Sequence, residues 1–362
     1  MNFLKNLFKE PNKPIKSNEE FWAWFQKNER TFFKVIKEQG DIEKQFFDII
    51  SPKLNELKPG YFYLTGMFDD NTAELILTAD GVVKNIFFVE ELINSAPYID
   101  GWKFTALKPA LDIKNVKIDM GGYSFDDKNI SFYSNDDKNC PDNIDITVVH
   151  NALNDANKAV ITNGVFIFLD NFLGELNLVT TIDDIQVVGK NEVVIEFIPI
   201  EKLKDFLIWR EKEFVEKYDV VTYDAENSTG SILEAKLESG NALIAAINTD
   251  LLNWVNKASH PWILDVEIKY DGSRNNGMPN NDTSILLNTI QDEIAEIFMD
   301  TDGYLNIGRQ TAEGIRDIYF ACKEFRKPSA VLDHIQKKYA AKIELGYDIY
   351  KDKYWQSFNR FR

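Results

Sequence analysis

Residues 262–271 read WILDVEIKYD, and their alternation is the strongest structural signal in the chain. Every second residue is apolar: Trp262, Leu264, Val266, Ile268 and Tyr270. From Asp265 onward the residues between them are polar. A period of two places successive side chains on opposite faces of an extended strand. The stretch therefore predicts a β-strand with one buried face.

The segments that follow predict the order strand, helix, strand, strand, helix, strand. We expect a helix at about 282–300, with Asp282 or Thr283 near its cap, then strands at 304–310 and 315–322 joined by a turn at 311–314. A second helix follows Pro328, and a last strand spans 343–349. This order is that of a ferredoxin-like βαββαβ module, in which both helices pack on one face of the sheet.

The preceding residues predict a second α+β region. Ser17 and Glu20 have the spacing of a capping box and begin a helical hairpin that ends before Pro59. Strand and helix patterns then alternate up to about residue 218, and the polar stretch 219–230 is typical of a linker. We predict an α+β protein of two α/β-sandwich domains, 59–218 and 219–362, preceded by an N-terminal tail and helical hairpin, 1–58.

The apolar stretch 160–176 fits two structures. The spacing of its larger apolar residues favours a helix, whereas Val165 and Ile167 would suit a strand. We predict a helix with Gly164 as its weak point. On such a helix Asp170 and Glu175 would be separated by about 140 degrees, so they do not form a simple acid–base pair. Helix capping or a salt bridge is the expected role of each.

Composition excludes several classes of protein. The chain has 362 residues, 44% of them hydrophobic, and a formal net charge of −17, which would repel nucleic-acid phosphates. Its two cysteines, Cys140 and Cys322, form no CxxC pair, so we expect a reducing cytoplasm. Lysines interrupt the apolar residues of 1–16, which predicts no signal peptide, and no run approaches the roughly 20 apolar residues of a membrane span.

Known catalytic motifs are missing from the sequence. It contains no GxxxxGK[ST], GxGxxG or GxSxG, and its three histidines, His150, His260 and His334, lie on separate segments. The acidic stretch 135–145 lacks the spacing of a calcium-binding loop, so a solvated loop is expected there. We therefore expect no metal and no cofactor, identify no catalytic residue, and favour a protein that is not an enzyme.

One pair of arginines is a candidate ligand site. Arg309 and Arg316 flank the predicted turn between two adjacent strands, with Thr311 between them. Two guanidinium groups so placed can hold a carboxylate or a phosphate by paired hydrogen bonds. His260, at the entrance of strand 262–270, could serve as a base or ligand beside them, or be structural. The alternative for the arginines is a cross-strand ion pair with a nearby acid.

The C-terminal tail is a candidate surface for a partner. It combines aromatic residues, Tyr354, Trp355, Phe358 and Phe361, with several lysines and arginines. Such a tail could contact an acidic protein or a membrane surface. Docking of the tail onto the acidic body of the same chain is the simpler interpretation.

Four short strings carry a family resemblance: HPW at 260–262, NGMP at 276–279, IGRQT at 307–311 and GIRDIYF at 314–320. Together they resemble bacterial proteins catalogued as domain of unknown function 695, over roughly residues 225–350. The first half of the chain looks like the region that precedes this domain in longer relatives. The family has no established activity. Relatives joined to a domain similar to the protein inhibitor of ribonuclease E imply a regulatory binding role.

Two hypotheses of function follow. The first is an uncharacterised cytoplasmic protein that binds another protein, with no nucleic acid or membrane as partner. The second is an enzyme or small-anion-binding protein with a site between the two domains that uses Arg309 and Arg316. An antitoxin or immunity-like inhibitor is a third possibility, and the acidity of the chain is its only support.

Overall fold

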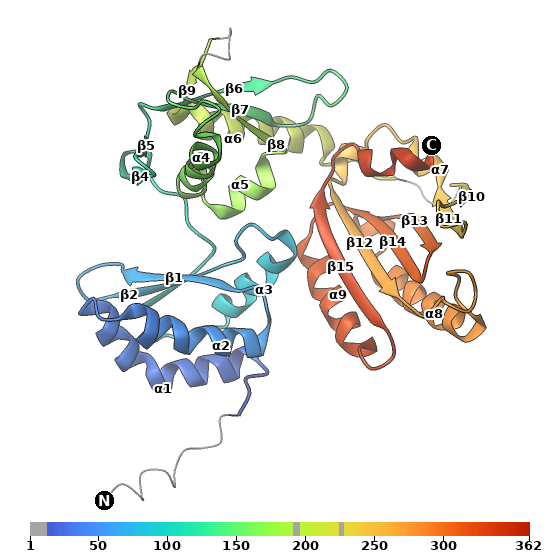
Figure 1. The fold of residues 1–362 in the computed structure, drawn as a ribbon, viewed down its shortest axis with the longest axis horizontal. Coiled ribbons are helices and arrows are strands. Elements are labelled where there is room, and N and C mark those ends of the chain that lie inside the picture. The colour runs from blue at the N-terminus through green and yellow to red at the C-terminus, as the bar shows by residue number, and fades with distance from the viewer. Residues whose placement is uncertain (1–12, 191–195, 224–227) are drawn as a thin grey trace, which may run out of the picture. The chain divides into compact units, whose positions relative to one another are not determined.

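The structure is a computed structural model that describes residues 13–190, 196–223 and 228–362. Residues 1–12, which carry most of the prediction of no signal peptide, lie outside the described residues. So do residues 224–227, which are part of the predicted linker. Helices and sheets are both present, which confirms the α+β class (Figure 1). The chain forms two compact units: unit 1 is Met1–Leu111 with Asp170–Leu176, and unit 2 is Asp112–Leu169 with Asn177–Arg362. The predicted boundaries at 58/59 and 218/219 stay a prediction.

Unit 1 is a three-stranded sheet covered by helices. The helices α1 (Asn18–Lys37) and α2 (Asp48–Leu57) form the predicted hairpin, with a short π-helix, η1 (Glu43–Phe47), leading into α2. The sheet has the order β1-β2-β3: β1 (Phe62–Met67) is antiparallel to β2 (Ala73–Thr78), and β3 (Trp102–Ala106) is parallel to β2. The helix α3 (Val83–Asn94) connects the two parallel strands, as the sequence predicts.

The aromatic residues of the hairpin form the core of unit 1. The Ser17 side chain accepts a hydrogen bond from Glu20 N, which is the predicted helix cap. Phe25 lies edge-on to Trp102, with ring centroids 4.9 Å apart, and Trp22 Nε1 donates to Leu92 O at 2.8 Å. The rings therefore cover the sheet of their own unit, and α1 and α3 share one of its faces.

The segment 158–181 is helical, as predicted, but it breaks at a different glycine. The helix α4 (Lys158–Leu173) runs through Gly164, where the ring of Phe125 occupies the space that a side chain would fill. Gly164 as the weak point is thus wrong. The chain bends by 106° at Gly174, before α5 (Glu175–Thr181). Gly174 has φ +79°, and a Cβ there would lie 2.8 Å from Ala110 N, so both conformation and space require glycine.

Asp170 and Glu175 fasten their segment to the rest of unit 1. Asp170 accepts a hydrogen bond from Lys108 Nζ at 2.8 Å. The buried Glu175 carboxylate accepts from Thr78 Oγ1 at 2.5 Å, and also from Gly81 N and Lys108 N. Asp170 therefore has the predicted role of a salt-bridge partner. Glu175 is structural too, but it accepts from a hydroxyl and from backbone N–H groups of other segments, which is neither the helix cap nor the salt bridge that the sequence predicts.

The first part of unit 2 contains a four-stranded sheet of order β8-β7-β6-β9. Its strands are β6 (Ile130–Asn135), β7 (Asp145–His150), β8 (Asp184–Gly189) and β9 (Ile198–Pro199). A hairpin of β4 (Ile118–Met120) and β5 (Tyr123–Phe125) precedes them, and η2 (Ile113–Asn115) precedes that hairpin. The helix α6 (Leu203–Tyr218) follows β9 through the single turn η4 (Ile200–Lys202).

The rest of unit 2 is a six-stranded antiparallel sheet of order β10-β11-β13-β14-β12-β15. The strands are β10 (Gly230–Lys236), β11 (Ala242–Asn248), β12 (Trp262–Lys269), β13 (Tyr304–Ala312), β14 (Ile315–Cys322) and β15 (Glu344–Lys351). Short helices α7 (Thr249–Leu252) and η5 (Lys257–Ser259) lead into β12, and η6 (Asp300–Asp302) leads into β13.

The helices α8 (Asn281–Ile297) and α9 (Arg326–Tyr339) cover one face of this sheet (Figure 1). Glu293 on α8 accepts hydrogen bonds from Lys338 and Tyr339 on α9, so the two helices lie side by side, as predicted. The cap of α8 is Asn280, whose side chain accepts from Thr283 N at 2.9 Å. The prediction of a cap at Asp282 or Thr283 was wrong, because the Asn280 backbone already has the extended conformation of a cap.

The strand β12 is buried along the whole of one face, and at its start on the other face as well. Leu264, Val266 and Ile268 pack toward α8 and α9, as the alternation predicts. Ile263 is also fully buried, because the C-terminal helix η7 (Gln356–Phe361) covers the opposite face. The cluster on that face comprises residues of β11, α7, β12, β13, β14 and the tail, among them Ile263, Leu305, Tyr319, Trp355, Phe358 and Phe361. The prediction of a single buried face therefore holds toward Glu267 and Lys269, and is wrong only at the start of the strand.

Ion pairs join the two parts of unit 2. Asp183, just before β8, lies between two lysines of the C-terminal part: Lys351 Nζ at 2.8 Å and Lys353 Nζ at 2.6 Å. Asp142 accepts hydrogen bonds from Tyr218 of α6 and from Tyr354 of the tail, at 2.7 and 2.6 Å. These contacts connect the part with the four-stranded sheet to the part with the six-stranded sheet. Separating the two parts would leave buried charges without a partner, which is costly.

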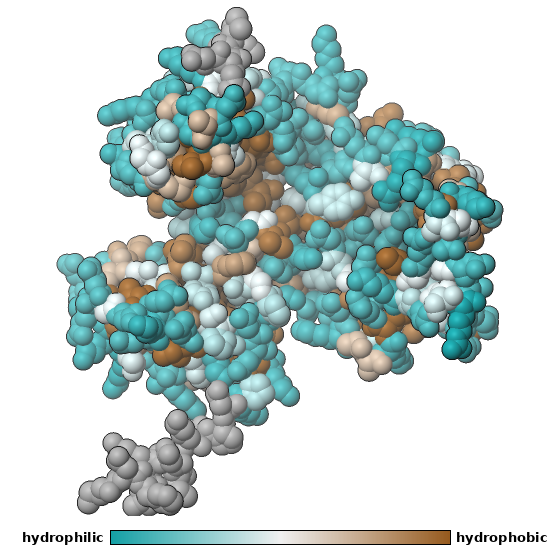
Figure 2. Space-filling model, viewed as in Figure 1, coloured by the Kyte–Doolittle hydropathy of each residue, from teal (hydrophilic) through white to brown (hydrophobic). Residues whose placement is uncertain are grey.

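No single helix among the described residues is long and apolar enough to cross a membrane, and the bent pair α4 and α5 passes that test only when taken together. Hydrophilic side chains cover most of the surface in view, with smaller apolar patches between them (Figure 2). This surface agrees with the net charge of −17.

A glycine in β13 provides a test of the sheet geometry. Gly308 has φ +139°, and a Cβ there would collide with Ala246 O of β11. We expect Gly308→Ala to destabilise the β11–β13 pairing by about 2 to 4 kcal/mol. The matched control is Gly346→Ala in β15, where a Cβ meets no atom within 4 Å; it should change stability by less than about 1 kcal/mol. Hydrogen exchange of the β11 and β13 amides in the full chain measures both effects, and equal protection in the two variants would contradict this geometry.

A carboxylate on the tail-covered face predicts a pH dependence of stability. Burial, together with the nearby Asp317, raises the pKa of Asp265 to about 7, and Asp265 Oδ1 has no hydrogen-bond partner among the described residues. A folded-state pKa above the unfolded value gives stability that is present at low pH and is lost as pH rises from about 4 to 7. Asp265→Asn removes this loss. From pH 5 to pH 8 the variant should gain on the order of 2 kcal/mol relative to the parent chain.

The measurement is the protection of β12 and β14 amides at both pH values, corrected for intrinsic exchange rates. The exposed Asp292→Asn serves as the control and should follow the parent chain at both pH values. If Asp265→Asn also follows the parent chain, Asp265 is already ionised at pH 5 and the raised pKa is incorrect.

Candidate functional site

A β-bulge in β13 shapes the site. The pairing of β13 with β14 shifts in register between Asn306 and Gly308, so one extra residue, Ile307, lies in β13. In a regular strand Asn306 and Arg309 would point to opposite faces. The bulge changes this alternation, and both residues line the same pocket. Gly308 permits the close approach of β11 described above.

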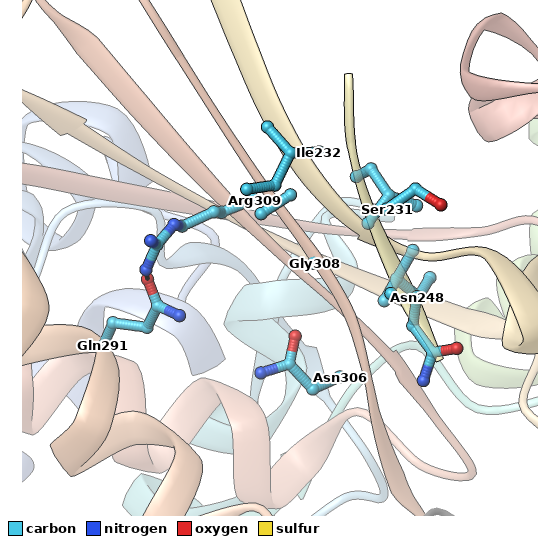
Figure 3. A pocket seen from close by; sticks show the side chains of 11 residues that line it. Ser231, Ile232, Asn248, Gln291, Asn306, Gly308 and Arg309 are labelled. Carbon is cyan, nitrogen blue, oxygen red and sulfur yellow. Dashed lines mark hydrogen bonds between the residues drawn. The ribbon is translucent and has the colours of Figure 1, made fainter. Parts of the chain in front are cut away.

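The pocket has a volume of about 420 Å³ and lies where β10, β11 and β13 meet α8. Figure 3 shows the side chains of Arg309 and Gln291 directed toward each other and the Asn306 amide on the same side of β13. The lining residues are mostly polar or small: Gly230, Ser231, Ile232, Ala246, Ile247, Asn248, Gln291, Asn306, Ile307, Gly308 and Arg309. Amide, hydroxyl and guanidinium groups therefore converge on one space.

Neutral side chains of α8 accept hydrogen bonds from the two arginines of the predicted ligand site. Arg309 Nη1 donates to Gln291 Oε1 at 2.8 Å. Arg316 Nη1 donates to Asn288 Oδ1 at 2.8 Å, and its Nε donates to Thr311 Oγ1 at 3.2 Å. Asn288 and Gln291 are three residues apart and so lie on the same side of α8. The structure thus brings Arg309, Thr311 and Arg316 together on the α8 face of the sheet.

The two guanidinium groups carry unbalanced positive charge. Within the described ranges, no carboxylate lies within 4.0 Å of Arg309 or Arg316; Asp317, a possible partner, instead accepts from Gln310 Nε2. Arg316 is only 6% exposed. Burial, and then the charge of Arg309, lower the pKa of Arg316 to about 10, so it remains a cation at neutral pH. A buried cation without a counter-ion is costly, and a bound anion would relieve that cost.

His260 lies away from the arginines. It precedes β12, whereas Ile268 at the far end of β12 pairs with Arg316, and eight residues of strand span roughly 25 Å. His260 Nδ1 lies 2.8 Å from Ser259 Oγ, and its ring packs against Trp254. Burial, and then the charge of Lys323, lower the pKa of His260 to about 3, so the ring is neutral. These contacts favour the structural role that the sequence offers for His260.

The aromatic residues of the tail lie inside unit 2. Trp355 and Phe358 are each 1% exposed, and Phe361 is also buried against Tyr319. Trp355 Nε1 donates to His260 O at 3.0 Å. Tyr354 directs its hydroxyl to Asp142. The rings are thus packed against the chain itself, which is the simpler of the two interpretations of the tail and not the partner surface.

Several site residues have no distinctive pattern in the sequence. Gln291 and Asn288 resemble any polar residues on the exposed side of a helix, and Ser231 and Asn248 come from the hairpin before the predicted module. The single available signal was Gly308, because glycine within a strand pattern indicates a bulge or a close backbone approach. Within the described residues, no group of three or more histidine, cysteine or acidic residues could hold a metal ion.

No curated protein and no solved structure matches the chain at a significant level. Residues 233–361 match a family model described as a family of unknown function, DUF695. This range includes β13, β14, α8 and both arginines, and it ends within the tail. The C-terminal part of the chain therefore matches the DUF695 family, as its HPW, NGMP, IGRQT and GIRDIYF strings indicate.

Proposed function

We propose that the DUF695 domain is a binding module for a small anion, held by Arg309 at the β-bulge and supported by the charge of Arg316. The observation that carries the proposal is the pairing of both guanidinium groups with neutral oxygens only, among the described residues. A guanidinium has five N–H donors, and Arg309 uses one of them on Gln291. The remaining donors can bind a carboxylate or a phosphate.

The neutral partners suit such a site. Gln291 and Asn288 fix the directions of the guanidinium groups without neutralising them. An acid in either place would form an internal ion pair and compete with the ligand. Because the whole chain carries a net charge of −17, a local cluster of cations is needed to attract an anion to this surface.

The proposal also includes the fold of the region that holds the site and the location of the protein. The strands β13, β14, β12 and β15 lie side by side in that order, all antiparallel, with α8 between β12 and β13 and α9 between β14 and β15. This order supports a ferredoxin-like module, to which β10 and β11 add a hairpin at one edge. The free thiols Cys140 and Cys322 support a cytoplasmic location for the protein.

Binding of a protein partner through the tail, the other function expected from the sequence, would require the tail to leave the core. The burial of Trp355 and Phe358 makes that opening costly, since each ring contributes several kcal/mol of packing. The anion-binding proposal needs no such rearrangement.

The test is titration of the full chain with inorganic phosphate and with acetate at constant ionic strength, followed by calorimetry and by protein NMR. Arg309→Gln keeps a hydrogen-bonding side chain and removes the charge. We expect it to weaken binding of the preferred anion by roughly tenfold or more, the effect of one charge-assisted pair. The matched control, Arg274→Gln, removes an equally charged but exposed residue and should bind like the parent chain. Equal affinity of the parent chain and Arg309→Gln, or no binding of either anion, would refute the proposal.

A further inference from the structure

A second pocket adjoins the arginine pocket. It also has a volume of about 420 Å³, and Asn248 and Asn306 line both spaces. Its walls come from the C-terminal end of α8, the start of β13 and the residues between them. The two pockets are therefore neighbours along β13, and we call them together the β13 groove.

The two halves of the β13 groove differ in chemistry. The first half contains the Arg309 guanidinium and the amide of Gln291. The second half is mainly apolar: its lining includes Leu251, Ala295, Phe298, Met299, Tyr304 and Leu305, with Asp300 and Thr301 as polar residues. The rings of Phe298 and Tyr304 lie 5.0 Å apart and form a buried wall. Met299 is 50% exposed, so a large apolar side chain lies at the opening.

Asn306 lies at the junction. Its side-chain amide makes no hydrogen bond to any described residue, and it belongs to both pockets. Arg309 is five positions after Tyr304, so the apolar wall and the guanidinium lie roughly 15 Å apart along the strand. A ligand that occupies both halves must therefore be elongated and must have one charged end.

We infer that the β13 groove binds an amphipathic carboxylate, with the carboxylate at Arg309 and an apolar chain against Phe298 and Tyr304. This inference rests on the proposed function and specifies its ligand. Charge complementarity fixes the orientation of the ligand, because the cation lies in one half of the groove and the apolar wall in the other. The Asn306 amide can accommodate a polar group near the middle of the ligand.

The test compares acetate, hexanoate and decanoate by calorimetry on the full chain, with decanol as the neutral probe. Affinity should rise with chain length, and decanoate should bind about 100-fold more tightly than acetate, the effect of burying roughly four methylene groups. Decanol should bind more weakly than decanoate, because it has no charge for Arg309. Arg309→Gln should remove this preference for decanoate over decanol.

Ala295→Phe places a ring in the apolar half from the surface of α8. It should reduce decanoate affinity by about tenfold or more and leave acetate affinity unchanged. Thr289→Phe, on an exposed position of α8 outside both pockets, is the matched control for added bulk and should bind decanoate normally.

The outcomes separate the inference from the proposed function. If acetate binds through Arg309 and decanoate binds no better, the anion site stands and the amphipathic ligand is refuted. If decanoate binds Ala295→Phe and the parent chain equally, the chain of the ligand does not lie in the apolar half, and the inference fails. If no anion binds in an Arg309-dependent manner, the proposed function fails as well.

Discussion

Burial of β12, on one face along its length and on the other at Ile263, is the interaction on which the six-stranded sheet depends. α8 and α9 cover Leu264, Val266 and Ile268, and the tail covers Ile263 with Trp355 and Phe358. A strand covered on one face alone would leave the other half of its side chains in water. Because α8 and α9 form one layer and the C-terminal tail forms the other, each layer stabilises the sheet that the other requires. The tail is thus part of the fold.

The same packing positions the chemistry of the site. α8 contributes apolar residues to the core and, on the adjoining side, the amides of Asn288 and Gln291. These amides orient Arg316 and Arg309, whose strands are fixed by β12 and β11. The bulge at Ile307 then turns Asn306 and Arg309 toward one pocket. Rigid elements hold the polar groups in place, and among the described residues the two arginines donate only to neutral oxygens.

The contacts around Asp183 and Asp142 connect the tail to residues outside the region that matches DUF695, 233–361. Lys351 and Lys353 lie at the end of β15 and in the tail, and both pair with Asp183 from the four-stranded sheet. The tail therefore contacts the six-stranded sheet through its rings and the four-stranded sheet through its charges and Tyr354. This double role explains why a short aromatic and basic segment is packed inside unit 2.

Sequence patterns determined most of the elements of this protein, including the alternation of β12, the hairpin of α1 and α2, and the pairing of β13 with β14 that sets Arg309 beside Arg316. These features are local, since periodicity and turn residues act over a few positions. Tertiary structure alone decided the burial of Ile263 on the second face of β12, the break at Gly174 in place of Gly164, which part of the chain the tail rings cover, and the neutral partners of the arginines. Each of these depends on which distant atoms fill a space or meet a charge, and a pattern of nearby residues contains no information about atoms that only folding brings close.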